Sequence, residues 1–189
     1  MCIRDRSPDA PVLRALAERR VRWISEPELA VRFYAGPLIA VTGTNGKTTT
    51  TLMVAHLLEA AGIPAAAGGN VGGGLAPAAS DLALLPEPPA WYVLEMSSFQ
   101  LAGIESFRPD IGVVTNLSPD HLDRYADVSS YFADKARLFD NARASSRWVL
   151  PWGDDSVAGL AGDAEGERYF FDGGAGPQGA TAGSAHAYV

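Results

Sequence analysis

Two glycines, a lysine and a threonine stand where an apolar run passes into a helical pattern. Glycines let the backbone N–H groups of a loop close around an anion, a lysine adds positive charge, and a threonine hydroxyl can bind a metal ion. We therefore expect this loop to hold a nucleoside triphosphate together with Mg²⁺. The loop follows the apolar run at 38–41 and reads Thr42, Gly43, Thr44, Asn45, Gly46, Lys47, Thr48 and Thr49.

The spacing of this loop differs from that of the standard phosphate loop. The pattern G-x-x-x-x-G-K-[ST] would require a glycine at Val41, whereas this chain has G-x-x-G-K-T. The alternative is a strand-to-helix turn that contains glycine and lysine by chance. Glycine makes up only about 7% of average sequences, and the flanking patterns also fit, so phosphate binding is favoured.

An acid directly follows a second apolar run, at 91–94. The carboxylate of Glu95 should emerge at the ligand-binding edge of a parallel sheet, where it can hold Mg²⁺ opposite Thr48. The alternative is a helix-capping or surface acid. The lysine and threonine on an expected neighbouring strand favour the metal site.

A histidine lies between two acids shortly after the apolar run at 111–114, in Asp120-His121-Leu122-Asp123. An imidazole can bind a metal or polarise a phosphoryl or carboxyl oxygen, and a nearby acid fixes its tautomer. An ordinary exposed histidine is the alternative. The position of His121 beyond the end of a strand favours a functional role.

A lysine falls within the apolar stripe of the helical pattern at 129–141. Lys135 is costly to bury in its charged form, so a neutral amine becomes accessible. A neutral amine can react with carbon dioxide to give a carbamate, which is an anionic metal ligand. Snorkelling, in which the stem packs and the ammonium reaches water, is the alternative that the helical pattern alone favours.

Polar residues in two further loops can contact a ligand. Asn70 lies among glycines, where its amide can donate to a carboxylate or sugar, or where it can occupy a left-handed turn. Ser97, Ser98 and Gln100 follow Glu95 and can supply hydrogen bonds to a substrate, or they can cap a helix that starts there.

The elements that must position these residues alternate between strands and helices. This alternation predicts an α/β fold with a mostly parallel sheet and helices on both faces. In such a sheet the loops 43–49, 68–74, 95–100 and 116–124 lie at the carboxyl ends of strands, where ligands bind. The expected helices are 11–20, 26–34, 47–61 and 129–141; the expected strands are 21–24, 38–42, 91–94, 111–114 and 148–150; 68–74 and 173–183 are expected loops, and 185–189 the start of a strand.

Composition narrows the classes of function. The chain has 189 residues, 47% of them hydrophobic, and a formal net charge of −7, so general attraction to nucleic acid or anionic membrane is not expected. One cysteine excludes an internal disulfide framework and suits the cytoplasm. We see no stretch long enough to enter a membrane and no signal peptide, and residues 1–6 fit neither strand nor helix, as a foreign leader would.

Taken together, these residues resemble the Mur ligase family, the ATP-dependent amino-acid ligases of peptidoglycan precursor synthesis. The loop at 42–49 is similar to the phosphate loop of that family, which accounts for its short spacing. The family also carries Gly-Asn, an acid after the next strand, Asp-His-Leu-Asp and Tyr-x-x-x-Lys. Here these motifs occur in order as Gly69-Asn70, Glu95, residues 120–123 and Tyr131 to Lys135.

One stretch bears on the place of the chain within the family. Glu95-Met96-Ser97-Ser98-Phe99-Gln100-Leu101 resembles the Glu-Leu-Ser-Ser-Phe-Gln-Leu of the members that add D-glutamate to UDP-N-acetylmuramoyl-L-alanine. Members that add diaminopimelate or lysine usually have Ser-Ser-His instead. The resemblance covers residues 7–172.

The resemblance implies a role for each matching position. Lys47 would bind the β- and γ-phosphates of ATP, Thr48 and Glu95 would hold one Mg²⁺, and His121 with a carbamylated Lys135 would hold a second. The substrate UDP-N-acetylmuramoyl-L-alanine would be activated as an acyl phosphate before D-glutamate adds, and the complete enzyme would be a monomer. Contacts to this substrate would come from Asn70, Ser97, Gln100 and His121.

The resemblance also implies that the chain is a fragment, inactive alone. Residues 1–36 would be a leader plus the end of an N-terminal UDP-binding domain, and residues 37–189 a central ATP-binding domain that is incomplete at its C-terminal end. Alternatives are another Mur-type or folylpolyglutamate-type ligase, and a non-catalytic phosphate-loop ATP-binding module.

Overall fold

The fold is built on a parallel sheet of seven strands, in the order β4-β5-β3-β6-β7-β8-β9. The structure is a computed structural model that describes residues 2–3, 10–119, 125, 127–172 and 185–188. All pairings in the sheet are parallel, as the sequence predicts. The strands are β3 (Leu38–Thr42), β4 (Ala65–Gly69), β5 (Trp91–Glu95), β6 (Ile111–Val114), β7 (Arg147–Pro151), β8 (Glu167–Phe171) and β9 (Ala185–Tyr188), and a separate pair joins β1 (Cys2–Ile3) to β2 (Ile24–Ser25).

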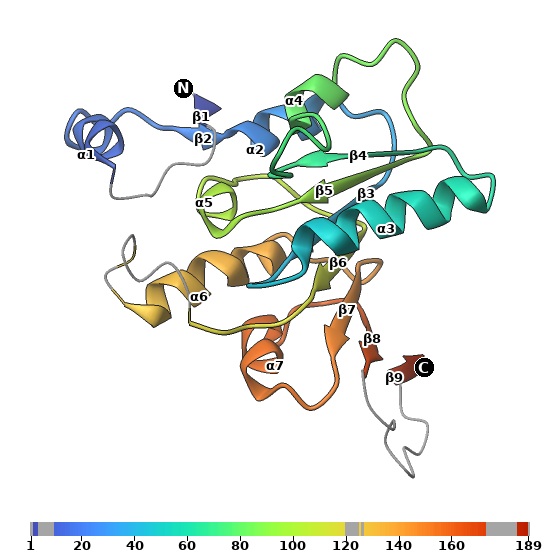
Figure 1. Cartoon of the computed structure of the whole chain (residues 1–189). Coiled ribbons are helices and arrows are strands. Elements are labelled where there is room, and N and C mark those ends of the chain that lie inside the picture. Colours follow the sequence, from blue (N-terminus) through green and yellow to red (C-terminus); the bar gives the residue numbers. More distant parts are fainter. Residues whose placement is uncertain (1, 4–9, 120–124, 126, 173–184, 189) are drawn as a thin grey trace.

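Helices cover both faces of this sheet, which confirms the expected α/β class (Figure 1). Successive residues of β3 point to opposite faces: Leu38 and Ala40 pack in one core, and Ile39 and Val41 in the other. The first core contains residues of α2, α4, α5, η2 and α7, and the second contains residues of α3. The helices are α1 (Pro11–Glu18), α2 (Glu26–Ala30), η1 (Val31–Phe33), α3 (Lys47–Ala60), α4 (Ala79–Leu82), α5 (Ser98–Leu101), α6 (Val128–Ala136), η2 (Arg137–Phe139) and α7 (Asp155–Ala161).

Several elements differ from the sequence-based prediction. The predicted strand at 21–24 is wrong except for its last residue, because only Ile24 and Ser25 pair. The predicted helix at 26–34 is a short α-helix that continues as a 3₁₀ turn, and the helix at 129–141 divides in the same way after Ala136. Strand β8 and helices α4 and α7 were not predicted, and the expectation that residues 1–6 contain no strand is wrong, because Cys2 and Ile3 pair with Ile24 and Ser25.

Strand β4 was also missed, because it lacks the large β-branched residues that mark a strand. Neighbours approach its two glycines closely: a Cβ on Gly68 would lie 2.7 Å from the Leu82 side chain, and one on Gly69 would lie 2.4 Å from the Glu95 carbonyl oxygen. Close packing therefore requires glycine at positions 68 and 69, and the alanine and glycine residues of β4 make the sequence look like a loop.

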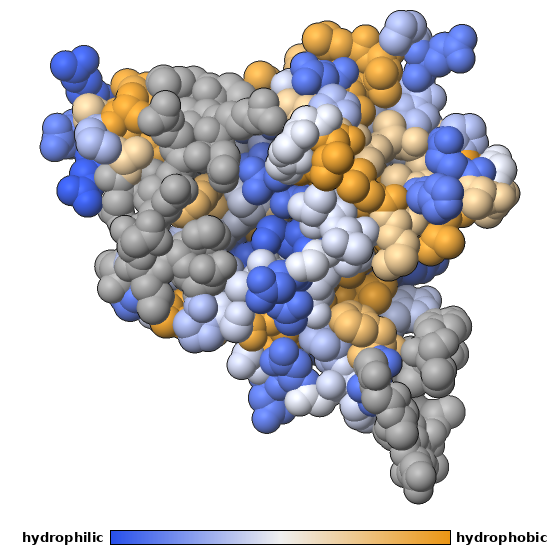
Figure 2. Space-filling model, viewed as in Figure 1, coloured by the Kyte–Doolittle hydropathy of each residue, from blue (hydrophilic) through white to orange (hydrophobic). Residues whose placement is uncertain are grey.

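One part of the second face carries an apolar groove of about 490 Å³ beside α3. Figure 2 shows hydrophobic residues over α3 and beneath it, where β6 and β7 lie. The groove is lined by Ile39, Thr50, Met53, Val54, Ile111, Val113, Thr115, Val149 and Phe171. None of the helices in the described ranges is long and apolar enough to cross a bilayer.

The segment before β3 packs on the same core as the sheet. Ala30 is almost completely buried there, and the Tyr34 ring stacks on that of Tyr92 with a centroid distance of 3.8 Å. The Tyr34 hydroxyl donates to the Ala79 carbonyl oxygen at 2.8 Å. Residues 24–34 are therefore firmly attached to the sheet.

The carboxylate of Glu28 fastens this segment. It is fully buried and accepts hydrogen bonds from the backbone N–H groups of Glu105, Ser106 and Phe107 at 2.8–3.0 Å. The Ser106 hydroxyl and the Arg32 guanidinium also donate to it. Burial by itself would raise the pKa of Glu28, but these hydrogen bonds outweigh it and hold the pKa below its ordinary value of 4.5.

We predict that Glu28→Gln lowers the free energy of unfolding by about 3 kcal/mol, because an amide would face three N–H donors in a buried site. Urea unfolding measures this change. Since the folded-state pKa lies below the unfolded value, the carboxylate stabilises the fold above about pH 4.5 and loses this effect as pH falls through the folded-state pKa.

The matched control is Glu59→Gln, at an exposed carboxylate that accepts one hydrogen bond from Ala65 N. It should change the free energy of unfolding by less than about 1 kcal/mol. Equal effects of the two substitutions, or an acid-side loss of stability that Glu28→Gln leaves unaltered, would contradict the assigned role of Glu28.

Candidate phosphate-binding site

The loop after β3 lies where the sheet changes direction. From β3 the chain runs to β4 and β5 on one side of β3 and then to β6 on the other. Such a switch point at the carboxyl ends of the strands is where α/β sheets bind ligands. Gly43 and Gly46 adopt φ values of 137° and 78°, which glycine tolerates best, and α3 begins at Lys47.

The hydrogen bonds of the loop divide its backbone N–H groups into two sets. Thr44 N donates to the Asn116 carbonyl oxygen, and Asn45 N donates to Asn116 Oδ1, both at 3.0 Å. Thr50 N makes the first intrahelical bond, to Gly46 O. The N–H groups of residues 46–49 precede that bond at the positive end of α3, so they remain as donors for an anion.

A hydroxyl and a carboxylate meet next to these donors. Thr48 Oγ1, in the first turn of α3, donates at 2.6 Å to Oε2 of Glu95, which ends β5, the strand next to β3. The Lys47 ammonium donates to the Thr44 carbonyl oxygen at 2.8 Å, so its charge lies at the loop. The predicted neighbourhood of Lys47, Thr48 and Glu95 is therefore confirmed as geometry.

This arrangement fits Mg²⁺. Hydroxyl and carboxylate oxygens are ligands that Mg²⁺ prefers, and Mg²⁺ usually keeps water and phosphate as its remaining ligands. Among the described residues there is no group of three or more His, Cys, Asp or Glu that would form an all-protein metal site. Thr48 and Glu95 would thus hold the ion together with a bound phosphate.

Lys135 reaches the same loop from α6. Its side chain is 1% exposed, and Nζ donates to the Gly43 carbonyl oxygen at 2.7 Å. Nζ also lies 4.7 Å from the centroid of the Tyr131 ring. The inward orientation is confirmed, and the snorkelling alternative is wrong because the amine ends inside the protein.

Ser97 and Gln100 cap a helix. Ser97 Oγ accepts from Gln100 N at 3.2 Å, and Gln100 Oε1 accepts from Ser97 N at 3.0 Å, which is the reciprocal capping box of α5. Gln100 is completely buried, and Ser97 is 8% exposed. The capping alternative is therefore confirmed for both residues, and their contact with a substrate stays a prediction.

Asn70 lies at the same edge of the sheet. Its N–H donates to the Glu95 carbonyl oxygen at 3.0 Å, which places it directly beside the predicted metal ligand. Within the described residues Arg20 is the non-glycine residue with positive φ, so the left-handed turn alternative for Asn70 is wrong.

His121 lies outside the described residues, as do its acidic neighbours Asp120 and Asp123, but the chain on both sides of them is well anchored. Before them, Thr44 Oγ1 bonds to Ser118 N and Ser118 O, both at 3.0 Å. After them, Tyr125 stacks on Phe99 with a centroid distance of 5.3 Å, and its hydroxyl donates to Asp134 Oδ2.

Sequence reasoning missed the residues at the end of β6. Asn116 Nδ2 donates to the Asn45 carbonyl oxygen at 3.0 Å, and Thr115 Oγ1 donates to the same oxygen at 2.7 Å. Their position one strand away from the phosphate loop was the available signal. Polar side chains directly after the strand adjacent to β3 must lie beside that loop.

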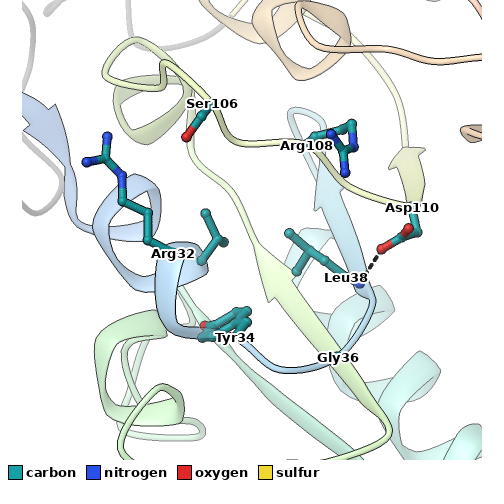
Figure 3. Close-up of a pocket in the computed structure, with 8 residues that line it drawn as sticks. Arg32, Tyr34, Gly36, Leu38, Ser106, Arg108 and Asp110 are labelled. Atoms are coloured by element: carbon teal, nitrogen blue, oxygen red, sulfur yellow. Dashed lines mark hydrogen bonds between the residues drawn. The ribbon is translucent and has the colours of Figure 1, made fainter.

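A pocket of about 230 Å³ lies at the opposite edge of the sheet, where β3 and β6 begin. Asp110 Oδ2 accepts from Leu38 N there, and the Arg32 side chain points away from Leu38 (Figure 3). Because parallel sheets bind ligands at the carboxyl ends of their strands, this pocket is separate from the candidate site. It is lined by Val31, Arg32, Tyr34, Gly36, Leu38, Ser106, Arg108 and Asp110.

We predict that the two loop glycines respond differently to alanine. A Cβ on Gly43 would lie 2.0 Å from Thr115 Oγ1, whereas a Cβ on Gly46 would meet nothing within 4 Å. Gly43→Ala should therefore cost about 3 kcal/mol of stability from overlap plus backbone strain, and Gly46→Ala about 1 kcal/mol from strain alone. Denaturant unfolding without nucleotide compares them, and equal losses would contradict the close approach of Gly43 to β6.

Comparison of the sequence with known proteins identifies the family of this chain. The Mur ligase middle domain matches residues 41–173. The chain is 42% identical over 163 residues to the UDP-N-acetylmuramoylalanine–D-glutamate ligase of Desulfatibacillum aliphaticivorans, covering 86% of this chain and 35% of that protein. It is 45% identical over 152 residues to the ligase of the same name from Geotalea uraniireducens, covering 80% and 32%. The chain thus spans about a third of the length of these curated relatives.

Solved structures agree in fold. The UDP-N-acetylmuramate:L-alanyl-gamma-D-glutamyl-meso-diaminopimelate ligase from Neisseria meningitides aligns with a TM-score of 0.61 at 22% identity, over 88% of this chain and 56% of that chain. The MurF ligase from Thermotoga maritima, solved in complex with ADP, aligns with a TM-score of 0.60 at 16% identity, over 91% and 47%. With its phosphate loop and sheet at 41–173, this chain belongs to the Mur ligase family through the middle domain of that family.

Proposed function

We propose that this chain is the ATP-binding part of a longer ligase that joins D-glutamate to UDP-N-acetylmuramoyl-L-alanine in peptidoglycan precursor synthesis. One observation carries the nucleotide-dependent chemistry: the Thr48 hydroxyl lies 2.6 Å from the Glu95 carboxylate, beside the backbone N–H groups at the start of α3. The curated relatives named for this reaction share 41–45% identity with the chain and support the choice of substrates.

The proposed reaction has two steps. An oxygen of the alanine carboxylate attacks the γ-phosphorus of ATP, the bond to the β-phosphate oxygen breaks, and an acyl phosphate and ADP result. The amine of D-glutamate then attacks the acyl carbon and loses a proton, and inorganic phosphate leaves. Both the nucleophile and ATP are anionic in the first step, so nearby positive charge must reduce their repulsion.

The chain supplies residues for this task. In our proposal Lys47 and the N–H groups of residues 46–49 bind the phosphates, and Thr48 and Glu95 hold one Mg²⁺, which supplies charge neutralisation when bound. His121 and a carbamate on Lys135 hold a second Mg²⁺. Asn70, Ser97, Gln100 and His121 contact the nucleotide-sugar substrate. The burial of Lys135 against the phosphate loop supports its assignment.

We further propose a cytoplasmic location and a monomeric complete enzyme that does not bind nucleic acid. The substrates are soluble nucleotide sugars and amino acids, and the net charge of −7 disfavours binding to polyanions.

The test is phosphate release from ATP by the complete ligase, with UDP-N-acetylmuramoyl-L-alanine and several amino acids offered in turn. Release that requires both the nucleotide sugar and D-glutamate is the expected outcome. Release with a different amino acid would move the chain to another member of the family. Release without any acceptor would indicate a nucleotide hydrolase and overturn the proposal.

For the complete ligase we predict that Glu95→Gln lowers kcat/KM at least about 100-fold, because a neutral amide is a poor ligand for Mg²⁺. Raising the Mg²⁺ concentration should restore part of the loss. The control is Glu105→Gln, at a carboxylate that pairs with Arg22 on the surface. An unchanged Mg²⁺ dependence in Glu95→Gln would remove this residue from the metal site.

A further inference from the structure

The Asn116 side chain holds the main chain of the phosphate loop at one residue, Asn45. Its Oδ1 accepts from Asn45 N, and its Nδ2 donates to Asn45 O, both at 3.0 Å. Thr115 Oγ1 donates to the same carbonyl oxygen at 2.7 Å. A side-chain amide carries a donor and an acceptor side by side, so asparagine can satisfy both groups of Asn45 at once.

The carbonyl oxygens of the loop are held in the same way. Gly43 O accepts from Lys135 Nζ, Thr44 O accepts from Lys47 Nζ, and Asn45 O accepts from Asn116 and Thr115. Each of these oxygens carries partial negative charge, and an anion in the loop would be repelled by any that turned toward it. The hydrogen bonds therefore direct the carbonyl oxygens of three successive residues toward donor groups of the protein.

The N–H groups complete the pattern. Those of Thr44 and Asn45 are taken by Asn116, while those of residues 46–49 precede the first intrahelical hydrogen bond. The end of β6 thus determines which amides of the loop are available to phosphate. It also fixes the close approach of Gly43, where a Cβ would lie 2.0 Å from Thr115 Oγ1.

We propose that Asn116 is a positioning residue for nucleotide binding: by holding the N–H and carbonyl groups of Asn45, it keeps the Asn45 carbonyl away from the phosphates and leaves the N–H groups of residues 46–49 as the donors. This inference rests on the proposed nucleotide site. It assigns no contact between Asn116 and the nucleotide itself.

The test is Asn116→Ala in the 189-residue chain, with two readouts. Titration calorimetry with MgADP should show about tenfold weaker binding, since the loop must be reordered when the ligand enters. Hydrogen exchange of the nucleotide-free chain should show at least about tenfold faster exchange at the Asn45 amide, because that N–H loses its acceptor.

The matched control is Asn141→Ala. The Asn141 amide also donates to two backbone carbonyl oxygens, those of Glu105 and Phe107, at 3.1 and 2.9 Å, but it lies away from the loop. It should lower thermal stability without changing either the affinity for MgADP or the exchange at Asn45. A merely structural role for Asn116 would make the two variants alike.

Thr115→Val is the second variant and preserves the shape of the side chain. It removes one of the donors to Asn45 O and should weaken MgADP binding about threefold. If Asn116→Ala does not fold, MgADP binding by Thr115→Val tests the proposal instead. Unchanged affinity in the folded variant, or unchanged exchange at Asn45 in Asn116→Ala, would overturn the proposal.

The two proposals fail separately. If the complete ligase releases phosphate without D-glutamate while Asn116→Ala still weakens MgADP binding and exposes Asn45, the positioning role stands and the proposed reaction falls. If ligation of D-glutamate is found but Asn116→Ala binds MgADP as the unmodified chain does, the reaction stands and the positioning role falls.

Discussion

The close contact between the phosphate loop and the end of β6 is the constraint on which the candidate site depends. Gly43 approaches Thr115 so nearly that no side chain fits between them, and Asn116 bonds to both main-chain polar groups of Asn45. With the loop pinned on this side, α3 starts at Lys47 and brings Thr48 to Glu95 on the opposite neighbour of β3. A chain with a net charge of −7 must attract a polyanion locally, and this fixed set of donors provides that attraction.

Much of the site could be predicted from the sequence because its residues are tied to strand ends. The apolar runs before Lys47 and Glu95 indicate parallel strands, and parallel strands bring their carboxyl ends to one edge. The apolar stripe of the helix also places Lys135 on the inward face, although the helical pattern alone favours snorkelling over the observed burial of its amine. The sequence does not predict that Lys135 binds the Gly43 carbonyl oxygen, since the two residues are 92 positions apart and their contact depends on how α6 packs.

Other features depend on close packing that a single sequence does not reveal. The end of strand β4 has glycines at 68 and 69 because Leu82 and the Glu95 main chain leave no room for a side chain, and its run of alanine and glycine resembles a loop. From the sequence, Asn116 looks like an ordinary polar residue at the end of a strand, and only the structure shows that it binds Asn45 in the phosphate loop. Ser97 and Gln100 illustrate the reverse case, because the same residues that resemble a substrate motif also make a complete capping box.

The fastening of Glu28 has a consequence for the order in which the chain folds. Its carboxylate precedes β3, whereas the N–H group of Phe107 that it binds comes 79 residues later. At ribosomal rates of about 5–20 residues per second, Glu28 emerges roughly 4 to 16 s before this partner. During that interval the ionised Glu28 side chain remains hydrated, because the N–H groups that bind it have not yet been synthesised. Strands β3, β4 and β5, three of the seven strands of the sheet, are therefore synthesised before Glu28 can be bound, and its burial requires that β5 and the turn after α5 have been completed.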